Sequence, residues 1–247
     1  MTFNIKRKSL MLAASFLIAG ASAAFAAGSI TGSYHDLSAS GGGPVRAASG
    51  QQDNEICVWC HTPHGANTGA FSAPLWNKAN DTQHYAMYGT TLPGTVSASS
   101  PDPVSLSCLS CHDGVSAINS VILQPSDDST DFVYHNPSAY SSTEVTLGAT
   151  PAGVANTMSG VSDVTTNLQG THPVSIQYTA GVAGLKATGT PLSGWLGESS
   201  SATIGDLLYN GQITCASCHD PHNDTNNFFL RVNNEDGSTL CFACHGL

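Results

Sequence analysis

The chain has 247 residues, carries a formal net charge of −10 at pH 7, and is 40% hydrophobic and only 10% charged. Soluble domains usually contain about 25% charged and about 45–50% apolar residues. A basic nucleic-acid binder is excluded as a first hypothesis, because 7 lysines and arginines stand against 17 acidic residues and would not neutralise phosphates. The low hydrophobic fraction predicts that something other than side-chain packing supplies part of the core.

The first 26 residues have the pattern of a secretory signal peptide. A basic run at 6–8 precedes an apolar stretch at 10–19, and Ala-Phe-Ala at 24–26 fits the cleavage rule. No later stretch approaches about 18 apolar residues, so no membrane span is expected. We therefore predict an exported protein whose mature part, 27–247, is a single domain. A buried N-terminal helix is the alternative for the first segment.

Eight cysteines in an exported chain first indicate four disulfides. However, the cysteines form four C-x-x-C pairs, and a histidine directly follows each pair. Structural zinc sites and thioredoxin-like motifs also use paired cysteines, but neither these nor disulfides require that histidine. The four motifs are Cys57, Cys60 and His61; Cys108, Cys111 and His112; Cys215, Cys218 and His219; and Cys241, Cys244 and His245.

C-x-x-C-H is the attachment motif of haem c. The two thiols form thioethers with the haem vinyl groups, and the adjacent histidine becomes the proximal iron ligand. Four motifs therefore predict four covalently bound haem c groups, with His61, His112, His219 and His245 as proximal ligands. The apolar macrocycles would act as the core, which accounts for the low hydrophobic fraction.

The second axial ligand of a haem iron in electron-transfer cytochromes is usually His or Met. Only Met87 and Met158 remain once the signal peptide is removed, too few for four irons. Histidines outside the motifs are numerous enough, so bis-histidine ligation is feasible at every iron, and such ligation lowers the reduction potential relative to His/Met haems. These histidines are His35, His64, His84, His135, His172 and His222.

Sequence context ranks these six histidines. His64 and His222 both lie in C-x-x-C-H-x-P-H, where they reach a neighbouring haem more easily than the far face of their own, so two haems exchanging ligands would stack. His172 precedes a proline and is expected in an extended segment. His35, near the mature N-terminus, is the fourth candidate, on this subunit or another. His135 and His84 rank lower. Either of them is an alternative for one of these four.

The motifs fall into two similar halves, about 51–112 and 215–245, which indicates an internal duplication of a haem pair. The segment between them, 114–214, is rich in Ser, Thr, Gly and Ala and is interpreted as turns and short strands, with a loop-rich insertion near 125–168. A disordered linker is the alternative for this segment. The fold class is therefore mostly irregular coil with short helices and a few short strands, wrapped around a linear chain of four haems.

A few local elements are expected within that coil. The run at 38–50 is interpreted as a flexible lead-in because of its Gly, Ser and Pro content. Short helical turns are expected at the haem motifs, a short strand at 173–178, and a short helix around 201–210.

The motifs and their flanking words resemble the doubled C-x-x-C-H cytochromes, and within these the OmcE-type tetrahaem cytochromes that polymerise into extracellular nanowires. The words are CVWCHTPHGA at 57–66, APLWN at 73–77, CLSCHDG at 108–114, THPVS at 171–175 and the terminal motif at 241–245. The resemblance implies little secondary structure, a continuous haem chain and bis-histidine ligation. The resemblance also implies that the distal ligands are His64, His222, His172 and His35. One of these four would ligate a haem of the next subunit.

A head-to-tail contact of this kind does not close and therefore produces a filament. The leading hypothesis is an electron conductor rather than an enzyme: an extracellular filament of identical subunits that passes electrons to other redox proteins or extracellular acceptors. The chain ends two residues after His245, so the fourth haem is expected to be poorly covered and accessible to a partner. A monomeric periplasmic or outer-surface electron shuttle is the main alternative, and a multihaem reductase is a weaker one.

Overall fold

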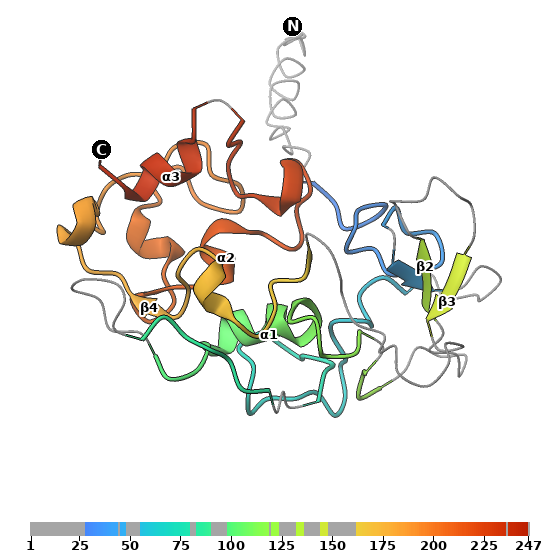
Figure 1. Ribbon diagram of the computed structural model, residues 1–247. Coiled ribbons are helices and arrows are strands. Elements are labelled where there is room, and N and C mark those ends of the chain that lie inside the picture. Colours follow the sequence, from blue (N-terminus) through green and yellow to red (C-terminus); the bar gives the residue numbers. More distant parts are fainter. Residues whose placement is uncertain are drawn as a thin grey trace, which may run out of the picture.

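The computed structural model describes residues 28–43, 45–47, 55–79, 83–89, 98–118, 120–123, 162–235 and 237–246, and the backbone of 132–135 and 144–147 (Figure 1). Loops dominate this part of the chain, as the sequence predicts. The helices are α1 (Pro103–His112), α2 (Cys215–Cys218) and α3 (Thr239–Cys244), with short 3-10 turns η2 (Leu168–Gly170), η3 (Val182–Gly184), η4 (Ile204–Leu207) and η5 (Asn227–Phe229). The strands are β1 (Val45–Ala47), β2 (Phe132–His135), β3 (Glu144–Leu147), β4 (Ile176–Gln177) and β5 (Gln212–Ile213).

The longest helix, α1, has clear start and stop signals. Pro103 occupies its first turn, and the side chain of Asp102 caps it by accepting hydrogen bonds from the backbone N–H groups of Val104 and Ser105. After the helix ends, Gly114 has a φ of +74°, and a Cβ there would lie 2.4 Å from Oδ1 of Asp163. The second haem motif thus occupies the C-terminal half of a capped helix.

The two sheets are small and antiparallel. Strands β1, β2 and β3 form one sheet in that order, with Val45 opposite Tyr134 and His135 opposite Glu144, and β4 pairs with β5 in the other. In Figure 1 the three-stranded sheet lies to one side, away from α2 and α3. The prediction of a flexible lead-in at 38–50 is wrong at residues 45–47. These residues form β1, which pairs with β2 from the segment near 125–168.

Two other local predictions agree with the structure in part. The strand expected at 173–178 is present but shorter, at β4. The helix expected around 201–210 is the 3-10 turn η4, where the carboxylate of Asp206 accepts hydrogen bonds from the N–H and hydroxyl of Thr203. Residues 1–26, and with them the predicted signal peptide, lie outside the described residues.

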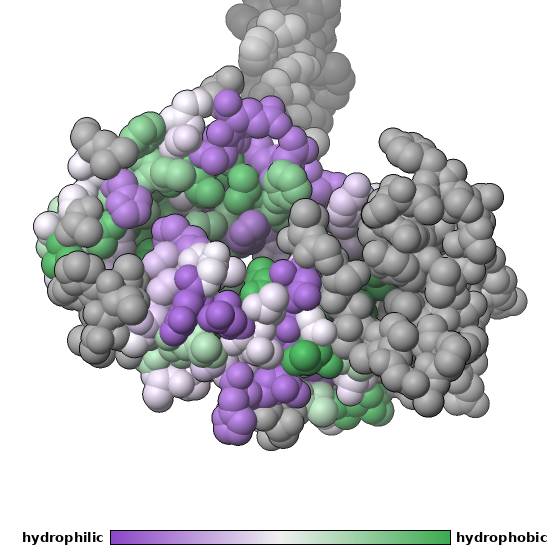
Figure 2. All heavy atoms as spheres, in the orientation of Figure 1, coloured by the Kyte–Doolittle hydropathy of each residue, from purple (hydrophilic) through white to green (hydrophobic). Residues whose placement is uncertain are grey.

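Buried apolar side chains form three separate clusters in the described part of the chain. The largest surrounds Ile204, Trp195 and Ile213 near α2 and α3, the second contains Trp59 and Ala47, and the third consists of Met87, Leu109 and Leu168. Figure 2 shows the face of the molecule that is turned to the viewer in Figure 1. Polar and apolar residues are mixed over this face, around a hollow in its middle. The clusters lie beside the C-x-x-C-H motifs, so side-chain packing alone forms no single core in the described part of the chain. Among the described residues, no helix is long and apolar enough to cross a membrane.

Candidate haem-binding site

One helical turn sets the geometry of each C-x-x-C-H motif. In the first, third and fourth motifs the N–H of the histidine donates to the carbonyl of the first cysteine, four residues back, at 2.8, 3.1 and 2.9 Å. In the second motif, all five residues belong to α1. Residues three and four apart in a helical turn lie on the same face. Each turn therefore presents two thiols and an imidazole together, the arrangement that haem attachment needs.

All eight cysteines are free thiols, so the disulfide alternative finds no support here. Burial raises the pKa of Cys60 to about 12 and that of Cys218 to about 11, with neighbouring thiols adding to both increases. These thiols therefore stay protonated in the unmodified chain. The zinc alternative is also unsupported, because no group of three or more His, Cys, Asp or Glu side chains within the described ranges is placed to hold a metal ion.

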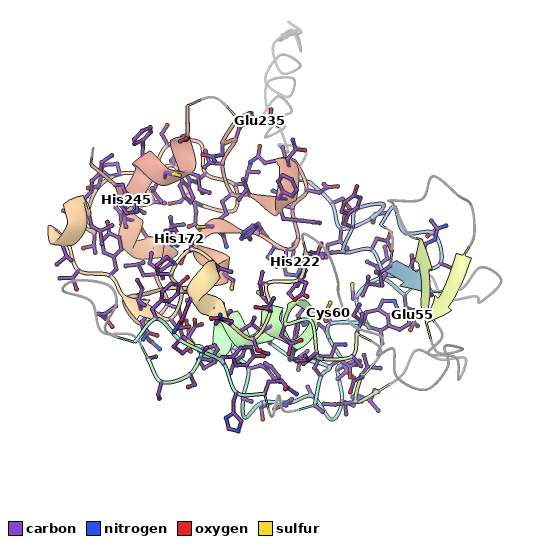
Figure 3. All side chains as sticks on the ribbon, viewed as in Figure 1. Glu55, Cys60, His172, His222, Glu235 and His245 are labelled. Atoms are coloured by element: carbon purple, nitrogen blue, oxygen red, sulfur yellow. The ribbon has the colours of Figure 1, made fainter. Side chains whose placement is uncertain are left out.

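Three proximal histidines each lie opposite a histidine from a distant part of the chain. The ring centroids of His61 and His222 are 6.1 Å apart, and those of His35 and His112 are also 6.1 Å apart. The third pair, His172 and His245, has centroids 6.5 Å apart, and Figure 3 shows these two side by side, with His222 nearer the middle of the molecule. These pairs bring together a proximal and a distal candidate in each case.

The separation of the rings fits a shared iron. A metal–imidazole bond is about 2 Å long, so one iron bound by two imidazole nitrogens on opposite sides sets the ring centroids roughly 6 Å apart. The three observed separations, 6.1 to 6.5 Å, match this value, whereas rings in direct stacking contact lie closer, as His35 and Phe229 do at 4.2 Å. The residues present therefore fit bis-histidine haem c, although the ligand assignments stay predictions.

Backbone carbonyls orient most of these imidazoles. Nδ1 of His61 lies 2.6 Å from the carbonyl oxygen of Pro74, and Nδ1 of His112 lies 2.8 Å from that of Ser162. With Nδ1–H donating, Nε2 is left unprotonated and able to bind a metal, as is usual for ligating histidines. Nδ1 also lies within hydrogen-bond distance of a backbone carbonyl oxygen in three other histidines. The pairs are His219 with Phe228, His35 with Pro221, and His172 with Pro173.

Burial favours the neutral form of three of these rings. Desolvation lowers the pKa of His35 to about 4, and it also lowers the pKa values of His112 and His172. A histidine must be neutral to bind a metal, so the low pKa values favour ligation.

The third motif differs from the other three. Among the described residues, no second histidine ring lies at a comparable distance from His219. A cavity of about 190 Å³ lies beside it, lined by Leu109, Leu168, Cys218 and others. Its predicted distal partner by ligand exchange, His64, is exposed, as is His84. The structure therefore brings His222 to the first motif but leaves the reciprocal half of the exchange open. His135 lies on β2, and its side chain is outside the described residues.

Cysteines of successive motifs lie close enough to affect one another's pKa values. The thiol of Cys215 hydrogen-bonds that of Cys108 and, together with burial, raises the pKa of Cys108 well above its ordinary value. Cys111 contributes to the raised pKa of Cys60, and Cys244 to that of Cys218. A thiol–thiol hydrogen bond thus joins the second motif to the third, whereas electrostatic interaction alone relates the thiols of the first to the second and of the third to the fourth.

Sequence reasoning missed the groups that surround the ligands. The orienting acceptors are backbone carbonyls, which every residue carries, so no residue type signals them. Phe229 stacks on His35 with ring planes 17° apart, and the pair of phenylalanines at 228–229 was the only available signal.

These arrangements are the ones that the haem-attachment motifs of a c-type cytochrome require. Residues 209–246, which contain the third and fourth motifs, match the family described as the doubled CXXCH motif. This match supports a multihaem cytochrome c-like family and an electron-carrier role, with covalently bound haem c. No curated protein matches the chain.

Proposed function

We propose that the protein is an exported tetrahaem c-type cytochrome with bis-histidine irons, which polymerises head-to-tail into an extracellular, electron-conducting filament. The four C-x-x-C-H motifs support the tetrahaem part of the proposal, and the three histidine pairs at 6.1 to 6.5 Å carry the bis-histidine part. The resemblance to OmcE-type cytochromes and the pattern of a signal peptide at 1–26 support the filament and the export.

The thiols, imidazoles and backbone carbonyls of the site have different roles in this function. Haem c, when bound, supplies a one-electron iron couple. The eight thiols would anchor the group covalently, the imidazoles would hold the iron, and the backbone carbonyls would fix the imidazole orientation. At the three histidine pairs no coordination position would stay open for a substrate, which favours electron transfer over the reductase alternative.

The hydrogen bond between Cys108 and Cys215, and the electrostatic interaction between cysteines of the other successive motifs, support a linear order of haems, first to fourth. Such an order would give a continuous path from one end of the subunit to the other. Haem content is the first test: mass spectrometry of the secreted protein, matured with a c-type haem attachment system, should show four haems per chain and cleavage after residue 26. A smaller number of haems, or retention of residues 1–26, would contradict this part of the proposal.

The third motif supports the filament. His219 lacks a second histidine in the described chain, and His64 is exposed. We propose that His64 of one subunit completes the iron held by His219 of the next. Metal–ligand bonds across such an interface would repeat from subunit to subunit and make the filament robust.

The monomeric shuttle remains a second candidate because three pairs close within one chain. Negative-stain microscopy combined with absorption spectroscopy separates the two functions. The filament requires fibres that disassemble in His64→Ala, with one haem per chain becoming high-spin on disassembly. Dispersed particles with four low-spin haems at every dilution would instead establish the shuttle.

A further inference from the structure

The segment Asn226–Leu230 contacts axial histidines of two different motifs. Its Phe228 accepts a hydrogen bond on its carbonyl oxygen from Nδ1 of His219, at 2.8 Å. The next residue, Phe229, stacks its ring on His35, with centroids 4.2 Å apart. His219 belongs to the third motif, whereas His35 lies opposite His112 of the second.

The backbone of this segment is strained where it makes these contacts. Phe228 and Phe229 have φ values of 58° and 57°, in the left-handed region that non-glycine residues rarely adopt. Two consecutive residues of this kind cost on the order of 1–3 kcal/mol each, so the surrounding contacts must hold them there. Strain of this kind is concentrated at functional sites.

Hydrogen bonds fasten the segment to the third motif on both sides of the strained residues. The N–H of Asp220 donates to the carbonyl of Phe229 at 2.8 Å, and the N–H of Arg231 donates to the carbonyl of Cys218 at 2.9 Å. The guanidinium of Arg231 adds a bond to the carbonyl of Ala216 at 2.7 Å and an ion pair with Glu198 at 3.1 Å. The segment is therefore anchored to the turn that carries His219.

His35 is held from the same region. Its Nδ1 lies 3.1 Å from the carbonyl oxygen of Pro221, two residues after His219. The two groups that orient His35 are thus Pro221 and Phe229, and both lie within ten residues after His219 of the third motif. The ring of His35 nevertheless faces His112 of the second motif. A stacked ring limits rotation of the imidazole about its own axis, which a single hydrogen bond does not.

We propose that Phe229 is a positioning residue that fixes the ring plane of His35, and that the strained segment around it makes the axial geometry of the second motif depend on the third. The inference rests on the proposed bis-histidine function. The side chain of Phe229 acts on His35 alone, because the contact of the segment with His219 uses a backbone carbonyl. Removing the aromatic ring should therefore alter one iron and leave the other three unchanged.

The test is electron paramagnetic resonance of the ferric, fully loaded protein, with carbon monoxide binding to the ferrous form as a second measurement. In Phe229→Leu we expect one low-spin signal of four to change its g-values, and one haem of four to bind carbon monoxide faster by several-fold. His35→Ala identifies that signal by removing it. Phe229→Tyr, which keeps a stacked ring, should restore the wild-type spectrum.

Phe71→Leu is the control, since Phe71 is a buried phenylalanine whose ring packs against Trp76 and not against a histidine. It should leave the His35-dependent signal unchanged. The proposal is overturned if Phe229→Leu keeps all four signals and the carbon monoxide rate of the wild type, or if Phe71→Leu changes the same signal equally. Failure of the bis-histidine function itself would be visible earlier, as high-spin haems in the unsubstituted protein.

Discussion

The imidazoles of His61 and His222 lie 6.1 Å apart with ring planes only 23° apart, although they belong to motifs in opposite halves of the chain. The other two pairs at such a distance are steep, with interplanar angles of 67° for His35 and His112 and 75° for His172 and His245. The His61–His222 pair therefore ties the first and third motifs together and differs from the other pairs in geometry. Both properties lead to measurable consequences.

His222→Ala should remove one ligand from the iron held by His61 and leave the other irons low-spin. We expect absorption and magnetic resonance spectra to show one high-spin haem of four, with covalent haem content unchanged because all eight cysteines remain. His84→Ala is the control, because His84 is exposed and makes no such ring pair among the described residues. A high-spin haem in His84→Ala, with none in His222→Ala, would reassign the ligand.

The interplanar angles predict two kinds of ferric low-spin signal. Near-parallel imidazole planes remove the near-degeneracy of the iron d orbitals and give a rhombic spectrum, whereas steep planes give a signal of much larger g-anisotropy. We expect one rhombic signal from the His61–His222 iron and two strongly anisotropic signals from the steep pairs. His222→Ala should abolish the rhombic signal specifically, and its loss in His172→Ala instead would contradict the assignment.

The proximal ligands are the part of the site that sequence predicts best, because their geometry is local. A histidine directly after C-x-x-C completes one helical turn, and that turn is present in the structure at His61, His219 and His245. The distal candidates required a different argument, by counting a rare residue type against the need for ligands. The structure places His35, His172 and His222 opposite motif histidines, and the ligand roles of these three and of His64 stay predictions.

Long-range contacts explain what sequence could not predict. Strand β1 forms because residues 45–47 pair with 132–134, and the Gly- and Ser-rich run around it carries no sign of that pairing. The stacking of Phe229 on His35 likewise joins distant segments, and the carbonyl acceptors have no residue signature. The coil-rich fold was predictable because four haem motifs leave little need for a side-chain core.

Asn77 is a structural anchor of the first motif. Its fully buried amide donates to the carbonyls of Val58 and Leu123 at 2.6 and 2.7 Å, and its Oδ1 accepts from the N–H of Leu123 at 2.9 Å. Asn77→Ala removes these three part-buried hydrogen bonds, at a cost of about 1–3 kcal/mol in the free energy of unfolding. Denaturant unfolding of the loaded protein measures this loss.

Gln177→Ala is the control for that measurement, because Gln177 is exposed and makes one side-chain hydrogen bond, to the carbonyl of Gly211. Surface substitutions of this kind usually change stability by about 0.5 kcal/mol or less. Equal losses for the two variants would mean that the buried bonds of Asn77 are not what stabilises the first motif.

Asp102 links the helix of the second motif to the segment that carries His172. Its carboxylate caps α1 and accepts hydrogen bonds from the hydroxyls of Ser105 and Ser175, at 2.6 and 2.7 Å. All three residues are buried, so truncation removes the cap and also leaves two buried hydroxyls without this partner. We expect Asp102→Ala to lower the free energy of unfolding by about 0.5–2 kcal/mol from the cap alone, with the unpaired hydroxyls adding to that loss.

The matched comparison is Asp206→Ala at η4. Asp206 also accepts hydrogen bonds from a backbone N–H and a hydroxyl, both from Thr203, but it is exposed. Water can replace these bonds, so the loss of stability should be clearly smaller than in Asp102→Ala, as measured by denaturant unfolding of both loaded variants. Equal losses would show that capping alone accounts for Asp102 and that its buried link to Ser175 contributes nothing. A larger loss for Asp102, matched by Ser175→Ala, would show that this link joins the second motif to the segment of His172.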